Sequence, residues 1–149
     1  MGKITGSSSA EIEAPIAAAY AAAADVEASP RWQPEIKVSE CLERDGDGNQ
    51  VLVHMETDAK VRRLGSEIRF SYEPTRRISW AQVDGDLKSV EGSWEFEALG
   101  DGRTRAIYKI EVDLGRTLGL LIRGPIVGVL KSQLINSMPE RLKRFVEEG

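Results

Sequence analysis

Few side chains in this sequence have a type and a spacing that could carry out chemistry. His54 is the only histidine and Cys41 the only cysteine, and the alternation around each of them predicts an outward-facing strand position. A zinc centre, a Ser-His-Asp triad or a Cys-His pair needs several such groups held together. We therefore assign no catalytic residue, and we expect neither a bound metal ion nor a cofactor.

Two charged residues are predicted to face the apolar side of their strands. Glu40 alternates in step with Ile36 and Val38, and Arg62 alternates in step with Phe70. A buried charge is costly unless it is paired, so an inward Glu40–Arg62 pair would orient the polar end of a ligand or supply an acid. The alternative is that both residues lie near strand ends, where a bulge or twist returns them to solvent.

The loop at 45–49 has some features of a calcium loop. Asp45, Asp47 and Asn49 alternate as oxygen ligands would, but Gln50 stands where the sharp turn of such a loop needs glycine. Asp-Gly and Gly-Asn are also common in hairpin turns. The hairpin interpretation is favoured, and no metal site is predicted here.

Aromatic side chains gather on one face of the predicted strands. Trp94 and Phe96 alternate with polar residues, as in a sheet that is covered on one side only. Gly92 and Ser66 fall on the same face and should leave space, and Tyr108 adds a polar group. The pattern favours an apolar pocket, although the same residues would also suit a solid core. The predicted lining is Met55, Phe70, Tyr72, Trp80, Trp94, Phe96, Tyr108, Val127, Leu130 and Leu134.

A sheet must position these side chains. Between residues 35 and 114 the hydrophobic pattern has a period of about two, and Gly-rich and Pro-containing turns divide it. A strand within 3–13 precedes this stretch, followed by a helix that begins near Pro15 and a short helical turn ending near Pro34. The six strands predicted after it are 35–44, 50–58, 61–73, 76–83, 87–99 and 103–114.

A C-terminal helix over about 124–148 should cover the dry face of the sheet. Its apolar residues, among them Leu130 and Leu142, recur every three or four positions, and Pro139 should kink the helix or split it in two. The expected fold class is α+β: a curved antiparallel sheet of about seven strands wrapped around a long C-terminal helix, with two short helices after the first strand.

The segment 117–129, TLGLLIRGPIVGV, is more apolar than one narrow helix face requires. It would suit a helix half buried against the sheet, a mobile gate at the mouth of a cavity, or a patch for transient contact with a membrane or partner. Hydropathy and spacing do not choose between these three.

Length, charge and cysteine count exclude several classes of protein. The 149 residues fit one domain spanning 1–149. A net charge of -4 gives no reason to expect nucleic-acid binding. One cysteine excludes an internal disulfide, no signal peptide is apparent, and the apolar run at 118–130 is too short to span a bilayer. We expect a cytoplasmic protein of unknown oligomeric state.

The order of these elements resembles the START-like (SRPBCC) superfamily, and within it the polyketide cyclase/dehydrase and lipid-transport group. The matching features are AEIEAPIAAAYAAAAD after the first strand, Trp32-Gln33-Pro34, the double strand ISWAQVDGDLKSVEGSWEFEALGDGRTRAIYKIEVD, and the closing amphipathic helix. The resemblance implies a helix-grip fold with a cavity between sheet and helix. Its members bind lipids, sterols, polyketides, hormones or quinones, and it implies no universal catalytic residue.

Three functions follow from these observations. The first is binding, transport or sequestration of a hydrophobic small molecule such as a lipid, quinone or polyketide-like compound. The second is a cyclase/dehydratase-like or hydrolase enzyme that uses the same cavity with one acid or base, Glu40, Arg62 or Tyr108. The third is an interaction protein that uses 117–129. Binding is favoured because few titratable residues are predicted to face inward.

Overall fold

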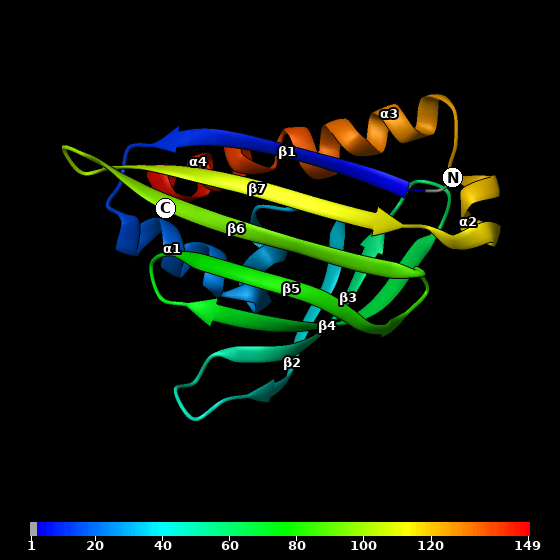
Figure 1. The fold of residues 1–149 in the computed structure, drawn as a ribbon, viewed down its shortest axis with the longest axis horizontal. Coiled ribbons are helices and arrows are strands. Elements are labelled where there is room, and N and C mark those ends of the chain that lie inside the picture. The colour runs from blue at the N-terminus through cyan, green and yellow to red at the C-terminus, as the bar shows by residue number, and fades with distance from the viewer. Residues whose placement is uncertain (1–2) are drawn as a thin grey trace.

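The computed structural model describes residues 3–149, and its main feature is a seven-stranded antiparallel sheet (Figure 1). The strand order is β1-β7-β6-β5-β4-β3-β2, so the first strand pairs with the last. The strands are β1 (Lys3–Ile12), β2 (Ile36–Arg44), β3 (Gln50–Asp58), β4 (Arg63–Glu73), β5 (Arg77–Gly85), β6 (Ser89–Gly100) and β7 (Arg103–Asp113). The predicted fold class is confirmed, and the six strands after β1 lie within about two residues of their predicted bounds.

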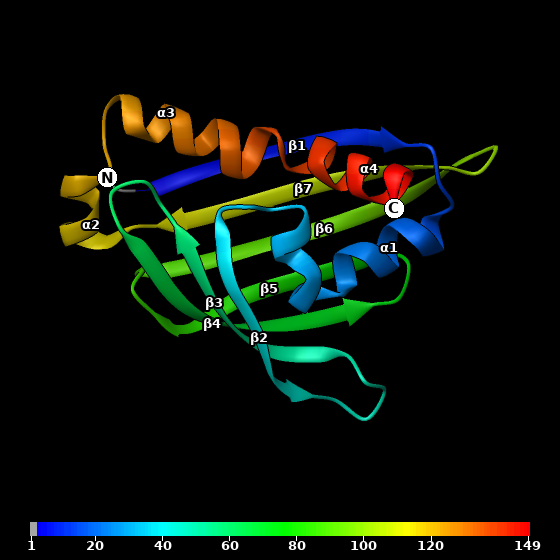
Figure 2. The same cartoon turned by 180° about the vertical axis from the view of Figure 1, so that it is seen from behind.

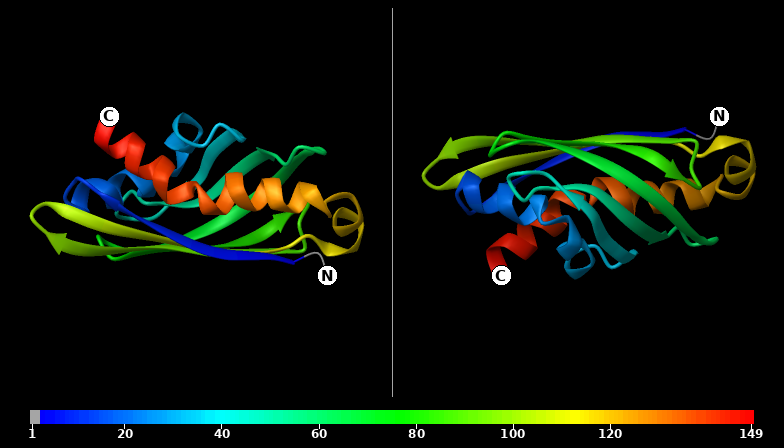
Figure 3. Two further views of the ribbon diagram at one scale, coloured as in Figure 1. Left: turned by 90° about the horizontal axis from the view of Figure 1, so that it is seen from above. Right: turned by 90° about the horizontal axis from the view of Figure 1, so that it is seen from below.

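Helices cover one face of this sheet. After β1 come α1 (Ile16–Ala24) and a 3₁₀ turn (Val26–Arg31); after β7 come α2 (Gly115–Leu121), α3 (Pro125–Lys131), a π-helical turn (Ser132–Asn136) and α4 (Met138–Glu148). Figures 2 and 3 show α3 and α4 running along the sheet while β2, β3 and β4 curl around their other side. This is the helix-grip arrangement that the sequence predicts.

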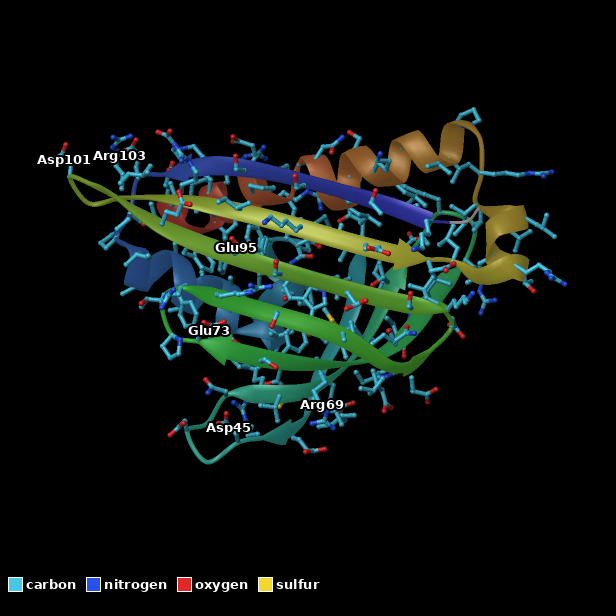
Figure 4. The ribbon with its side chains drawn as sticks, viewed as in Figure 1. Asp45, Arg69, Glu73, Glu95, Asp101 and Arg103 are labelled. Atoms are coloured by element: carbon cyan, nitrogen blue, oxygen red, sulfur yellow. The ribbon has the colours of Figure 1, made fainter. Side chains whose placement is uncertain are left out.

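The outer face of the sheet is charged, as the alternation predicts. The Lys109 Nζ lies 3.3 Å from the Glu95 Oε2 across β6 and β7, and Arg103 Nη1 lies 2.9 Å from the Glu11 Oε1. Figure 4 looks onto this outer face and labels Glu95 on it and Arg103 at the β6–β7 turn. Each exposed pair of this kind adds little stability. The charged side chains make this face the solvent-exposed one, and the opposite, apolar face forms the core.

The C-terminal helix changes its geometry just before Pro139, where the sequence predicts a kink. The N–H of Ser137 reaches back five residues to the carbonyl of Ser132 at 3.0 Å, which makes the turn π-helical. Proline has no N–H, so it leaves the carbonyl of Ile135 without its helical partner. The Ser8 hydroxyl of β1 donates to that carbonyl at 2.7 Å. A hydroxyl from the sheet thus replaces the missing helical hydrogen bond.

An ion pair fixes α4 to the loop before β2. Arg141 donates through both terminal nitrogens to the Glu35 carboxylate, with 2.9 Å between Nη2 and Oε2. Only 12% of the Glu35 side chain and 17% of the Arg141 side chain are exposed. Burial by itself raises the pKa of Glu35, but hydrogen bonds from Arg141 and from its own backbone amide outweigh that effect and lower the pKa.

The segment 117–129 is divided between core and surface. Leu118 and Ile122 are buried, whereas Leu120, Leu121 and Val129 are exposed. No helix of residues 3–149 is by itself long and apolar enough to cross a membrane. Taken together, α2 and the helical segment 125–148 have the length and apolar composition of a membrane-spanning segment, but the two are bent by 104° relative to each other.

Candidate ligand-binding cavity

A cavity of about 220 Å³ lies between the sheet and the helices α3 and α4. Protein cores rarely contain voids much larger than a water molecule, and an apolar cavity of roughly 150 Å³ can hold benzene. The space is therefore more than a packing defect, although it falls below the roughly 300 Å³ at which pockets for drug-sized ligands begin. As it stands it suits a small ring system or a short chain.

Seven of the ten residues predicted to line a pocket do line this cavity. They are Met55, Phe70, Trp80, Trp94, Tyr108, Leu130 and Leu134. The rings form one connected group, in which the Tyr108 ring centroid lies 4.7 Å from that of Trp94 and 5.8 Å from that of Trp80. That these residues bind a ligand stays a prediction, because the structure tests only their position.

The other three predicted residues lie outside the cavity. Tyr72 donates its hydroxyl to the carbonyl of Gln50 at 2.7 Å, which holds it at the far end of β4. Phe96 packs edge-on against Tyr20 of α1, with 5.9 Å between the ring centroids. Val127, in the first turn of α3, packs against the core without reaching the cavity. The face of each was predicted correctly, but its position along the sheet or helix was not.

Gly92 does not leave empty space, so this part of the prediction is wrong. It pairs with Trp80 across β5 and β6, and the Trp80 indole lies against it so closely that a Cβ at position 92 would stand 2.6 Å from the ring. The glycine is needed for this contact, since its missing side chain lets the indole lie flat on the sheet. Ser66, in contrast, lines the cavity as predicted.

Of the two alternatives for Glu40 and Arg62, the inward pair is wrong and the return to solvent is confirmed, because both residues are exposed. The β2 register shifts between Ile36 and Val38, so Glu40 stands opposite the outward-facing His54. A one-residue bulge exchanges the two faces of a strand. Arg62 precedes β4 in a turn, where its Nη2 lies 3.7 Å from the Asp86 Oδ2.

The same bulge moves two residues to the inner side. Ser39 stands opposite Met55 and donates its hydroxyl to the carbonyl of Val26 at 2.7 Å. Cys41 stands opposite the fully buried Val53, so its predicted outward position is wrong as well. Neither residue is part of the cavity wall. His54 faces outward as predicted, with its Nε2 3.0 Å from the Glu56 Oε2.

Several lining residues were not predicted. Ile4, Leu114, Ile122 and Ile135 come from the first strand, the loop after β7, the end of α2 and the π-helical turn. Strand alternation does not indicate where a strand end or loop meets the cavity. Trp32 also lines it, between the rings of Trp94 and Phe145 at 6.2 and 6.1 Å.

Polar groups are few in the cavity wall. Ser29, Gln33, Thr57 and Ser66 contribute hydroxyls and one amide, and the Ser66 hydroxyl already contacts the Gln82 Oε1 at 2.6 Å. None of the wall residues within 3–149 is an acid, a histidine, a lysine, an arginine or a cysteine. The cavity therefore offers a ligand mainly apolar contact, with a few hydrogen-bonding positions.

Tyr108 is the one titratable residue that the described part of the chain contributes to this wall. Burial alone raises the pKa of its phenol, without a contribution from a hydrogen bond or a neighbouring charge. The hydroxyl therefore stays protonated over the physiological pH range. It is a hydrogen-bond donor next to the faces of Trp80 and Trp94, available to an oxygen atom of a ligand.

The loop predicted as a hairpin rather than a calcium site has hairpin geometry. The Asp45 Oδ1 accepts from the backbone N–H of Asp47 and Asn49, each at 2.9 Å, and its Oδ2 accepts from the Asn49 amide at 3.0 Å. Along residues 3–149 no three histidine, cysteine or acidic residues cluster as a metal site would require.

A curved antiparallel sheet that closes on a C-terminal helix over an apolar cavity defines a START-like helix-grip protein. The sequence matches the family described as polyketide cyclase/dehydrase and lipid transport over residues 12–142, and the chain belongs to this family. Binding of hydrophobic ligands is typical of this family.

Individual relatives are distant. The chain is 26% identical to the ribosome association toxin RatA of Vibrio cholerae over 128 residues, which cover 83% of this chain and 85% of that protein. It resembles a START superfamily protein from Mycobacterium smegmatis with a TM-score of 0.82 and 22% identity, covering 97% of both chains. It also resembles the Zhui aromatase/cyclase from Streptomyces sp. R1128 with a TM-score of 0.80 and 18% identity, covering 98% and 94% of the two chains. The likeness to these two solved structures shows that the fold is shared and nothing more.

Proposed function

We propose that the protein binds and carries a small, flat, carbonyl-bearing ring compound, such as a quinone or an aromatic polyketide-like molecule. The observation that carries this proposal is the cavity wall, which is apolar and aromatic and, as far as residues 3–149 form it, has no charged side chain. Affinity would come mainly from apolar burial, at about 25 cal/mol per Å². A neutral donor at Tyr108 would fix the orientation of the ring.

The aromatic residues favour a ring over a chain. Trp80 and Trp94 each form a tilted contact with Tyr108 in the cavity wall, and a flat ligand can stack against such faces. The carbonyl oxygen of a quinone-like ring accepts hydrogen bonds and does not donate them, which matches the free O–H of Tyr108. An acyl chain would gain the same apolar burial but would use neither feature.

The wall does not favour the alternative of a cyclase, dehydratase or hydrolase. General acid–base catalysis works best with a group whose pKa lies near the working pH. Among the described wall residues the one titratable group is the Tyr108 phenol, whose pKa is raised by burial. Glu40 and Arg62 are at the surface. Binding without chemistry is the function this site supports.

A pair of matched ligands tests the proposal. Naphthoquinone and naphthalene have the same ring system, and only the first carries carbonyl oxygens. We expect both to bind by isothermal titration, with naphthoquinone the tighter by roughly 2–10-fold, the value of one hydrogen bond. Native mass spectrometry of the purified protein should show a bound aromatic molecule.

Filling the cavity provides the control. Leu130→Trp should abolish binding of both rings, because Leu130 lines the cavity, whereas Val129→Trp should leave it unchanged, because the neighbouring Val129 is exposed and lies outside the wall. If neither ring binds the unmodified protein and no copurified molecule is found, the proposal is wrong. A bound fatty acid would confirm the cavity and refute the preference for a ring, and turnover of a bound molecule would refute binding without chemistry.

A further inference from the structure

One end of the molecule carries large apolar side chains in solvent. Leu120 is 61% exposed and Leu121 51% exposed on α2, and Val129 is 46% exposed on α3. We call residues 115–131 the α2–α3 tip. Figures 1 and 2 show α2 at one extremity of the molecule, beyond the end of the sheet, and α3 running back from there alongside β1. Contiguous exposed apolar residues of this kind mark surfaces that contact something else.

The charge of the tip is opposite to that of the whole chain. Between Leu114 and Pro139 the charged residues are Arg116, Arg123 and Lys131, without any acid, although the net charge of the protein is -4. Arg116 and Arg123 are exposed. Two acidic residues of the neighbouring segments are already paired. The Asp86 Oδ2 in the β5–β6 turn lies 3.7 Å from the Arg62 Nη2, and the Asp113 Oδ2 at the end of β7 lies 3.9 Å from the Lys88 Nζ.

The cavity extends to this same end. Its wall there includes Ala59 after β3, Leu87 in the β5–β6 turn, and Leu114 and Ile122 on either side of α2. The residues that flank α2 on both sides therefore form part of the cavity wall. A surface that binds the tip would lie next to this end of the cavity.

We propose that the α2–α3 tip docks onto the surface of an anionic phospholipid bilayer, and that the ligand enters the cavity there. Leucine side chains that enter the boundary between headgroups and acyl chains gain apolar burial, and arginines bind the phosphates. A second copy of this chain fits less well, because two tips would bring like charges together. The entry route rests on the proposed function, whereas docking does not.

Co-sedimentation with vesicles tests docking on the intact protein. One vesicle preparation contains phosphatidylcholine alone, and the other contains phosphatidylcholine with phosphatidylglycerol. We expect binding to the anionic vesicles only, falling as salt is raised. Arg116→Gln with Arg123→Gln should weaken it by roughly fivefold per arginine, and Leu120→Glu with Leu121→Glu by about tenfold or more.

Two matched controls use the far side of the molecule. Arg76→Gln with Arg77→Gln removes two exposed arginines beside the β4–β5 turn, which follows Glu73 at the end of the sheet away from α2 (Figure 4). Leu42→Glu replaces a leucine of β2 that is 45% exposed with a charged residue. Both variants should bind vesicles like the unmodified protein. Equal losses in the control and tip variants would overturn the docking site.

Docking and the proposed function fail separately. Naphthoquinone binding in vesicle-free buffer reports on the cavity, and we expect it to be unchanged in both tip variants. If the protein ignores anionic vesicles while naphthoquinone still binds, docking is wrong and the proposed function stands. If vesicles bind through the tip but the cavity takes neither ring, docking stands and the proposed function is wrong.

Discussion

Replacing Gly92 by alanine should force the Trp80 indole away from the sheet and into the cavity. A methyl group at position 92 would stand 2.6–2.7 Å from three atoms of that ring, well inside van der Waals contact. Overpacking of this kind costs about 1–3 kcal/mol, partly offset by about 0.4–1 kcal/mol because alanine restricts the unfolded chain. A net loss of about 1–2 kcal/mol corresponds to a melting temperature lower by roughly 3–6 °C for a chain of this length.

Gly65→Ala is the matched control. Gly65 is also a strand glycine, but a Cβ there would lie 3.8 Å from the nearest atom, the Asp86 Oδ2, so it meets only ordinary contacts. We expect this variant to be as stable as the unmodified protein or slightly more stable. Differential scanning calorimetry measures both melting temperatures, and isothermal titration with naphthalene measures the cavity. If Gly92→Ala melts like Gly65→Ala and binds naphthalene normally, the indole does not lie on Gly92 and the description of the cavity is wrong.

Three further predictions address the polar groups. Tyr108→Phe should weaken naphthoquinone binding by roughly 2–10-fold and leave naphthalene binding and stability unchanged, because no residue of 3–149 contributes a hydrogen bond to the pKa of this phenol. The pKa of Glu35 is lowered in the folded protein, so its pairing with Arg141 stabilises the fold above the unfolded pKa of about 4.3, and this stability is lost as the pH falls through the folded pKa. Glu35→Gln should lower the free energy of unfolding by about 1–2 kcal/mol near neutral pH. In urea unfolding below pH 5, the stability of this variant should depend less on pH than that of the unmodified protein. Ser8→Ala should lose about 1 kcal/mol of unfolding free energy, but less than that in a Pro139→Ala background, where position 139 regains its N–H.

Controls for the Ser8 and Glu35 variants lie on the outer face. Ser7→Ala removes a hydroxyl from the same strand as Ser8 without touching the helix, and Glu43→Gln removes a carboxylate whose Oε2 is 3.8 Å from Arg69 in an exposed pair. Both should change the unfolding free energy by less than about 0.5 kcal/mol. An additive double-mutant cycle for Ser8 and Pro139 would show that the hydroxyl does not replace the helical hydrogen bond. An unchanged pH profile in Glu35→Gln would show that the pairing with Arg141 contributes nothing measurable.

The sequence by itself determined the fold and the composition of the inner face. Alternation with a period of two is a direct consequence of strand geometry, and it predicted the strands and assigned Phe70, Trp80, Trp94 and Tyr108 to one side. Apolar spacing of three and four residues in the same way predicted the C-terminal helix. Pro139 predicted an irregularity in that helix because proline lacks an N–H wherever it stands.

Other features were decided only by the tertiary structure. A single bulge in β2 exchanged the faces of Glu40 and Cys41, since alternation carries no record of an inserted residue. The Trp80 indole filled the space above Gly92, because which neighbour takes that space depends on cross-strand register. The cavity is what remains after all such contacts are made. Its volume, and the solvent-exposed position of Leu120 and Leu121 beside it, follow from how the helices meet the sheet, which local patterns of residues do not specify.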